Sequence, residues 1–133
     1  MTHKLILIVD DDYVYKLVMS RMIHLCYGSA EIIGAANGLE AMNLLQSALQ
    51  DVCLRMPDII LLDIEMPEMN GWGFLNAFSS LPPAATRNTD IYIVSSSIDE
   101  VDQEKSRIYT AVKDLLIKPI SADKLKYILN NRS

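Results

Sequence analysis

The sequence has no long hydrophobic run and fewer basic than acidic residues. Its 12 lysines and arginines stand against 17 acids, which leaves a net charge of −5. Binding to nucleic acid requires a basic surface that neutralises phosphates, so this balance argues against it. No apolar run approaches the roughly 18 residues that span a bilayer, and residues 1–4 lead into a strand-like segment without a cleavage site. We therefore expect a cytoplasmic protein that contacts neither nucleic acid nor membrane.

Cysteine is also scarce: the chain has only Cys26 and Cys53, and neither belongs to a CxxC pair. Both fall in segments that we predict to be helical. A free cysteine usually behaves as a small buried hydrophobe, so we expect reduced, packed thiols and neither a disulfide nor a metal role. His3 and His24 likewise have no partners at the spacing of metal ligands.

The remaining composition is that of a folded domain. Half of the 133 residues are hydrophobic and 22% are charged, and a chain of this length can bury a proper core. Because no linker or internal repeat divides the chain, we expect a single domain over residues 1–133. The acidic excess fits a metal site and a basic partner equally well.

Five short apolar runs predict the strands of a parallel sheet. The most informative run covers residues 59–62 and leads directly into Asp63. Unbroken apolar runs of this length favour strands that helices bury on both faces. The predicted strands cover residues 5–9, 31–36, 59–62, 91–94 and 115–117.

Helical segments alternate with these strands. In the first, apolar residues recur at Val14, Leu17, Val18, Met22 and Leu25, close to helical spacing, and part of this stripe should face the core. Five strands alternating with five helices predict an α/β fold, a doubly wound three-layer sandwich. The predicted helices cover residues 13–25, 39 to before 56, 72–78, 99–110 and 121–130, with a loop over 79–88.

Polar residues follow four of the predicted strands. Asp10 and Asp11 follow the first strand, Asp63 the third, Ser95 the fourth and Lys118 the fifth. Because the carboxyl ends of parallel strands lie at one edge of the sheet, we expect these side chains to converge. Three carboxylates against one ammonium leave an excess of negative charge, and hard oxygen ligands in an open cluster favour Mg²⁺.

These side chains suit phosphoryl transfer onto Asp63. A bound metal would let that carboxylate stay ionised beside its neighbours and act as a nucleophile. The Lys118 ammonium and the Ser95 hydroxyl are the cation and the donor needed to hold the equatorial oxygens of a transferring phosphoryl group.

Four motifs carry these residues along the chain: Val9-Asp10-Asp11-Asp12, Asp63-Ile64-Glu65-Met66-Pro67 with Gly71, Val94-Ser95-Ser96, and Lys118-Pro119. Their order and spacing resemble the receiver domains of two-component response regulators, over essentially the whole chain. The resemblance implies a five-stranded flavodoxin-like sheet with the strand order 2-1-3-4-5. It also implies a stand-alone receiver, like a chemotaxis response regulator. With no output domain, it would signal through protein contacts or onward phosphotransfer.

The resemblance implies three roles in phosphoryl transfer. Asp63 would be the phosphoacceptor, Lys118 its counter-ion, and Ser95 the switch hydroxyl that turns toward the phosphoryl group. The Lys118-Pro119 bond should be cis, a geometry that X-Pro bonds adopt at modest cost. Leu115 stands where the family often has an aromatic residue, so the signal should run through backbone movement near residues 95–99.

The resemblance also implies a Mg²⁺ site. The metal would be bound directly by Asp11 and Asp63 and through water by Asp10. The backbone carbonyl of Glu65 would complete the protein's share of the metal sphere. The side chain of Glu65 departs from the family pattern and should influence the lifetime of the phosphoryl group, in a direction that the sequence does not reveal.

The partners implied by the resemblance are a histidine kinase or a histidine phosphotransfer protein, and a downstream protein target. The donor would dock near Tyr13, Val14 and Leu17 on the first helix. The chain would be a signalling domain that assists its own phosphorylation and dephosphorylation, and not an enzyme. It would be a monomer or a phosphorylation-dependent dimer.

Two other functions compete with this hypothesis. One is a Mg²⁺-dependent phosphohydrolase with an aspartyl nucleophile, but such enzymes usually carry the nucleophile on the first strand and need a cap over the substrate. The other is a degenerate interaction module that works without phosphorylation. The chain carries all the acidic, hydroxyl and lysine residues that phosphorylation would use, which argues against such a module.

Overall fold

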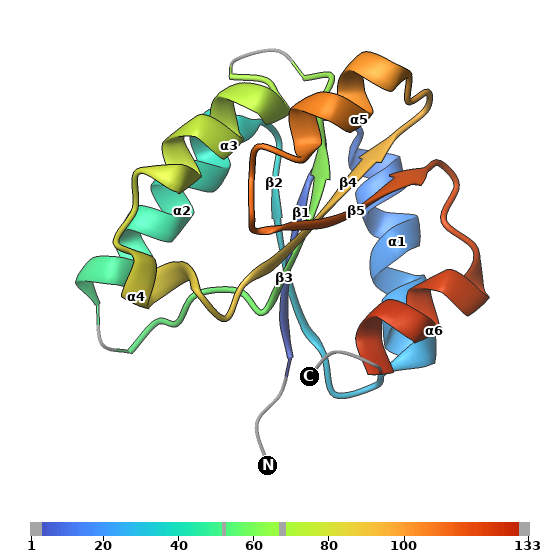
Figure 1. Ribbon diagram of the computed structural model, residues 1–133. Coiled ribbons are helices and arrows are strands. Elements are labelled where there is room, and N and C mark those ends of the chain that lie inside the picture. Colours follow the sequence, from blue (N-terminus) through green and yellow to red (C-terminus); the bar gives the residue numbers. More distant parts are fainter. Residues whose placement is uncertain (1–3, 52, 67–68, 131–133) are drawn as a thin grey trace.

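A computed structural model describes residues 4–51, 53–66 and 69–130 (Figure 1). Its five strands are all parallel and form one sheet in the order β2-β1-β3-β4-β5, which confirms the predicted topology. The strands are β1 (Leu5–Val9), β2 (Glu31–Ala35), β3 (Ile59–Asp63), β4 (Asp90–Ser95) and β5 (Val112–Ile117).

Helices cover both faces of the sheet, as expected for a three-layer sandwich. Figure 1 shows α2 and α3 on one side and α1 and α6 on the other. Among the described residues, none of the helices has the length and apolarity that a membrane span needs. The helices are α1 (Tyr13–Cys26), α2 (Gly38–Gln50), α3 (Gly71–Ser79), α4 (Pro83–Thr86), α5 (Glu100–Ser106) and α6 (Ala122–Asn130).

The two layers of core explain why β1 and β3, which are buried along their whole length, are apolar up to their carboxyl ends. Successive side chains of a strand point to opposite faces. In β1, Leu7 and Val9 join the cluster under α2 and α3, whereas Ile6 and Ile8 join the cluster under α1 and α6. A strand that is buried on both faces has no position for a polar residue until it ends, so β1 and β3 carry their carboxylates at their carboxyl ends.

The helix count was predicted incorrectly. We expected five helices and a loop over residues 79–88, but the described part of the chain has a sixth helix, α4, within that loop. Pro83 begins this single turn, where its fixed φ suits the first helical position. The α5 helix is shorter than predicted, and β5 begins three residues earlier, at Val112.

The first helix buries little of the apolar stripe that we expected to lie partly in the core. Val14, Leu17, Val18 and Leu25 are 64%, 52%, 52% and 87% exposed, and of the predicted stripe only Met22 packs against the core. The residues that face the sheet and α6 are Tyr15, Met19, Met22, Ile23 and Cys26. The helix therefore carries two apolar stripes, and spacing alone could not distinguish the buried stripe from the exposed one.

The prediction for the cysteines is correct for only one of them. Cys26 is partly buried on α1 and packs against the core, and both thiols are free. Cys53 is exposed and lies in a turn, because α2 ends at Gln50. The Asp51 carboxylate accepts a hydrogen bond from the Cys53 amide at 2.9 Å and so stabilises this turn.

Candidate functional site

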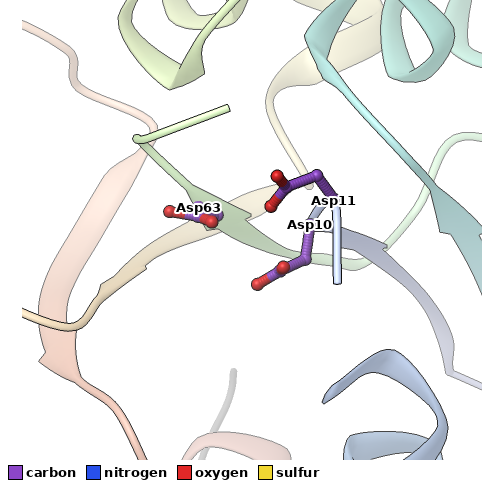
Figure 2. Close-up of side chains that lie close together, drawn as sticks. All are labelled: Asp10, Asp11 and Asp63. Atoms are coloured by element: carbon purple, nitrogen blue, oxygen red, sulfur yellow. The ribbon is translucent and has the colours of Figure 1, made fainter. Parts of the chain in front are cut away.

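Three carboxylates meet where β1 and β3 end (Figure 2). One oxygen each from Asp10, Asp11 and Asp63 lies within 4.8 Å of the other two. The exposure of Asp10 is 2% and that of Asp63 is 6%, whereas Asp11 is exposed. Buried carboxylates are costly unless they are paired or bind a metal. This cluster has the donor type and spacing of a site for a hard divalent cation.

The turn after β3 holds Asp63 in place. The Glu65 amide donates to Asp63 Oδ1 at 3.0 Å, and the Gly71 amide donates to the Ile64 carbonyl at 3.3 Å. A Cβ on Gly71 would lie 2.6 Å from Ile64 Cα and 2.8 Å from the Asp63 carbonyl oxygen, so only glycine fits here. Pro67, the last residue of the motif that begins at Asp63, lies outside the described residues.

Lys118 connects the two buried carboxylates. Its Nζ lies 2.7 Å from Asp10 Oδ2 and 3.6 Å from Asp63 Oδ2. The Asp12 amide donates to the other Asp10 oxygen at 2.9 Å. The Lys118 amide donates to the Ser95 carbonyl at 2.8 Å, which aligns the ends of β4 and β5. The Lys118-Pro119 bond is cis, as the resemblance implied.

The charges in the site act on one another. Burial raises the pKa of Asp63, and the charges of Asp10 and Asp11 add to the rise, although the Glu65 amide and Lys118 oppose it. Burial lowers the pKa of Lys118, but its hydrogen bond and attraction to Asp10, with a further part from Asp63, outweigh this and raise the pKa. The lysine therefore stays charged. Its single positive charge is smaller than the combined negative charge of the three carboxylates.

Ser95 is buried at the end of β4, with 1% exposure. Its hydroxyl donates to the Ser97 carbonyl at 3.0 Å. The hydroxyl is thus engaged within its own loop. Of the two positions at which the sequence departs from the family pattern, Glu65 is exposed and Leu115 is partly buried against the core.

Tyr15 is the site residue that we missed in the sequence. The face of its ring lies 4.3 Å from Lys118 Nζ, measured to the ring centroid. Its hydroxyl is buried, without a hydrogen-bond partner among the described residues. Burial raises the pKa of this hydroxyl, and the charges of Asp10 and Asp63 add to the rise. Its partner Lys118 is 103 positions away in the sequence, so no local pattern pointed to this contact.

Comparison with known proteins agrees with this geometry. Residues 6–130 match the family model described as the response regulator receiver domain. A protein-glutamate methylesterase/protein-glutamine glutaminase 2 of Chromobacterium violaceum is 31% identical over 123 residues, which are 90% of this chain and 30% of that protein. The chain thus spans less than half the length of this curated relative.

Solved structures show the same fold. A two-component response regulator from Cytophaga hutchinsonii superposes with a TM-score of 0.86 at 27% identity, over 98% of this chain and 97% of the other. The chemotaxis protein CheY4 of Vibrio cholerae is 22% identical and superposes with a TM-score of 0.79, over 99% of this chain and 100% of the other. The family match, which covers nearly the whole chain, places this protein among the receiver domains of two-component response regulators.

Proposed function

We propose that this receiver accepts a phosphoryl group on Asp63 from a phosphohistidine donor, in a Mg²⁺-dependent reaction. The observation that carries the proposal is the meeting of three carboxylates at the end of β1 and β3, with the Lys118 ammonium 2.7 Å from Asp10 and 3.6 Å from Asp63. A buried nucleophile beside a cation and a metal-binding cluster is the arrangement that phosphoryl transfer requires.

The acidic cluster fits Mg²⁺ in donor type and charge. We assign Asp11 and Asp63 as direct ligands, Asp10 as a ligand through water, and the Glu65 backbone carbonyl as the remaining protein donor. The bound ion would neutralise the carboxylates and the negative charge of the phosphoryl group. The raised pKa of Asp63 supports the need for such a charge, because burial and its acidic neighbours disfavour its ionised form.

Phosphorylation then proceeds through the chain's own residues. An Asp63 carboxylate oxygen attacks phosphorus and forms the P–O bond, while the P–N bond breaks and its electron pair stays on the imidazole of the donor. The Lys118 ammonium stabilises the charge on the equatorial oxygens. For dephosphorylation, a water oxygen attacks phosphorus and forms the new P–O bond, while the bond to Asp63 breaks and its electron pair stays on the carboxylate. Inorganic phosphate leaves, and the proton of the water passes to solvent.

The Ser95 hydroxyl supplies the conformational response in this proposal. Turning toward the phosphoryl group would break its hydrogen bond to the Ser97 carbonyl. The loop that follows leads to Asp99, which caps α5 with a reciprocal pair of hydrogen bonds to Asp102. Because Leu115 replaces an aromatic residue, the signal would travel through this loop and not through a ring rotation.

The exposed stripe of α1 is the surface that we propose for the donor. Tyr13, Val14 and Leu17 are all exposed apolar or aromatic residues in the first turns of the helix that follows Asp10 and Asp11. A histidine-containing protein that packs on this stripe would bring its phosphoryl group close to the acidic cluster. The stand-alone organisation, the downstream target, the oligomeric state and the cytoplasmic location stay predictions.

Intact mass spectrometry tests the proposal. The protein is incubated with acetyl phosphate and Mg²⁺, and we expect the gain of one phosphoryl group that Asp63→Asn abolishes. Asp123→Asn, which changes an exposed carboxylate on α6, is the matched control and should keep the gain. If the folded wild-type protein gains no phosphoryl group, the proposal fails, and steady turnover of phosphomonoesters would favour a hydrolase.

A further inference from the structure

The ring of Tyr15 covers the Lys118 ammonium, which also lies close to the proposed phosphoacceptor Asp63. Lys118 Nζ lies 4.3 Å from the ring centroid, 2.7 Å from Asp10 Oδ2 and 3.6 Å from Asp63 Oδ2. An ammonium over the face of an aromatic ring is attracted by its quadrupole, more strongly where water is excluded. The ring is therefore a third neighbour of the lysine, beside two carboxylates.

The position of the ring is fixed by the fold. Tyr15 lies in the first turn of α1, where its amide donates to the Asp12 carboxylate at 3.1 Å. Its side chain packs against the core cluster under α1 and α6. The lysine, in contrast, has a flexible four-carbon stem with many rotamers. A rigid ring beside a flexible cation can restrict where the cation goes.

We propose that Tyr15 is a positioning residue for phosphoryl transfer, whose ring holds the Lys118 ammonium between Asp10 and Asp63. This inference rests on the proposed function, since the position matters only if Asp63 receives a phosphoryl group. The contact to Asp10 is 0.9 Å shorter than the contact to Asp63. Without the ring, the ammonium would stay at Asp10 for more of the time and would contact the phosphoryl oxygens on Asp63 less often.

The hydroxyl of Tyr15 is not part of this role. It is buried without a hydrogen-bond partner among the described residues, so it does not orient the ring through a protein contact. Phenylalanine keeps the ring face and the packing volume, whereas methionine keeps apolar volume without a ring. The pair of substitutions therefore separates the cation–π contact from packing.

The experiment follows the rate of phosphoryl gain by intact mass, with acetyl phosphate and Mg²⁺. We expect Tyr15→Met to slow the reaction by about 5-fold, the equivalent of about 1 kcal/mol for a partly enclosed cation–π contact. Tyr15→Phe should restore the rate to within about twofold of wild type. Tyr127→Met is the control, because it removes an exposed ring that lies 5.5 Å from Lys124 on α6.

A double-mutant cycle asks whether Tyr15 acts through the lysine. In a Lys118→Met background, Tyr15→Met should cause no further loss, because the group that it positions is gone. An equal loss in both backgrounds, a Tyr15→Phe rate as low as that of Tyr15→Met, or a Tyr15→Met rate equal to wild type would each overturn the inference. Circular dichroism verifies folding, and Tyr15→Leu replaces Tyr15→Met if the latter is unfolded.

The same experiment separates this inference from the function on which it rests. If the wild-type protein is phosphorylated on Asp63 but Tyr15→Met reacts as fast, only the positioning role fails. If the wild-type protein gains no phosphoryl group, the proposed function fails, and the positioning role fails with it.

Discussion

Replacing Lys118 by methionine should strongly destabilise the metal-free protein, because the buried Asp10 carboxylate loses its cation. Asp10 is 2% exposed, and the Lys118 ammonium lies 2.7 Å from it. Removing one partner of a buried ion pair costs about 3–5 kcal/mol. The Lys118 side chain keeps 22% exposure and the Asp12 amide still donates to Asp10. We therefore expect a loss of about 2–3 kcal/mol.

Urea denaturation measures this loss. The midpoint should fall while the slope stays unchanged, because the substitution does not alter the surface exposed on unfolding. With added Mg²⁺, both proteins should become more stable, since a ligand that binds only the native state adds to the free energy of unfolding. The increase in the free energy of unfolding should be larger for Lys118→Met, because its acidic cluster carries one more uncompensated negative charge.

Lys113→Met is the matched control, since Lys113 lies on the same strand, β5. Its Nζ is 3.9 Å from Asp90 Oδ1 and its side chain is 51% exposed, so the loss should stay below about 1 kcal/mol. The reasoning is refuted if Lys118→Met costs no more than Lys113→Met. It is also refuted if Mg²⁺ stabilises Lys118→Met less than it stabilises the wild-type protein.

Three further outcomes are expected. The pKa of Asp63 is raised above its unfolded value, so without metal the free energy of unfolding should fall as pH rises above about 4, the ordinary pKa of a carboxyl group. Asp63→Asn should reduce that fall in urea titrations, and an identical pH profile would contradict it. Gly71→Ala should cost about 1–3 kcal/mol because its Cβ would meet backbone at 2.6 Å, whereas Gly28→Ala, with its nearest atom at 3.7 Å, should change the melting temperature little. Leu17→Ser, at an exposed position, should slow phosphorylation by a phosphohistidine protein while leaving the acetyl phosphate rate unchanged, and equal effects on both donors would argue against docking on α1.

Much of the site was predictable because its residues sit at strand ends. Asp63 follows a short apolar run that favours a buried strand, and the same holds for Asp10 after β1. Parallel strands share one carboxyl edge, so convergence followed from the topology without any knowledge of side-chain contacts. The strand order itself was implied by the family resemblance and is confirmed by the pairing of β1 with both β2 and β3.

Other features depended on contacts between segments that are distant in the sequence. The buried residues of α1 were predicted only in part, because exposed residues such as Val14 and Leu25 have the same helical spacing as a core stripe. Met19 and Ile23 are buried instead, since α6 and the sheet cover that side. The α4 turn was missed because one turn of helix after a proline leaves no periodic pattern to detect.

The sequence by itself determined the fold class and the polar groups that follow the strands, because a strand buried on both faces ends where the first charged residue appears. Only the tertiary structure decided how those groups pair. Lys118 lies 2.7 Å from Asp10 and 3.6 Å from Asp63, the Ser95 hydroxyl bonds to Ser97, and Tyr15 covers the ammonium. Such pairings depend on side-chain rotamers and on the packing of α1 against the sheet, which a linear pattern does not encode.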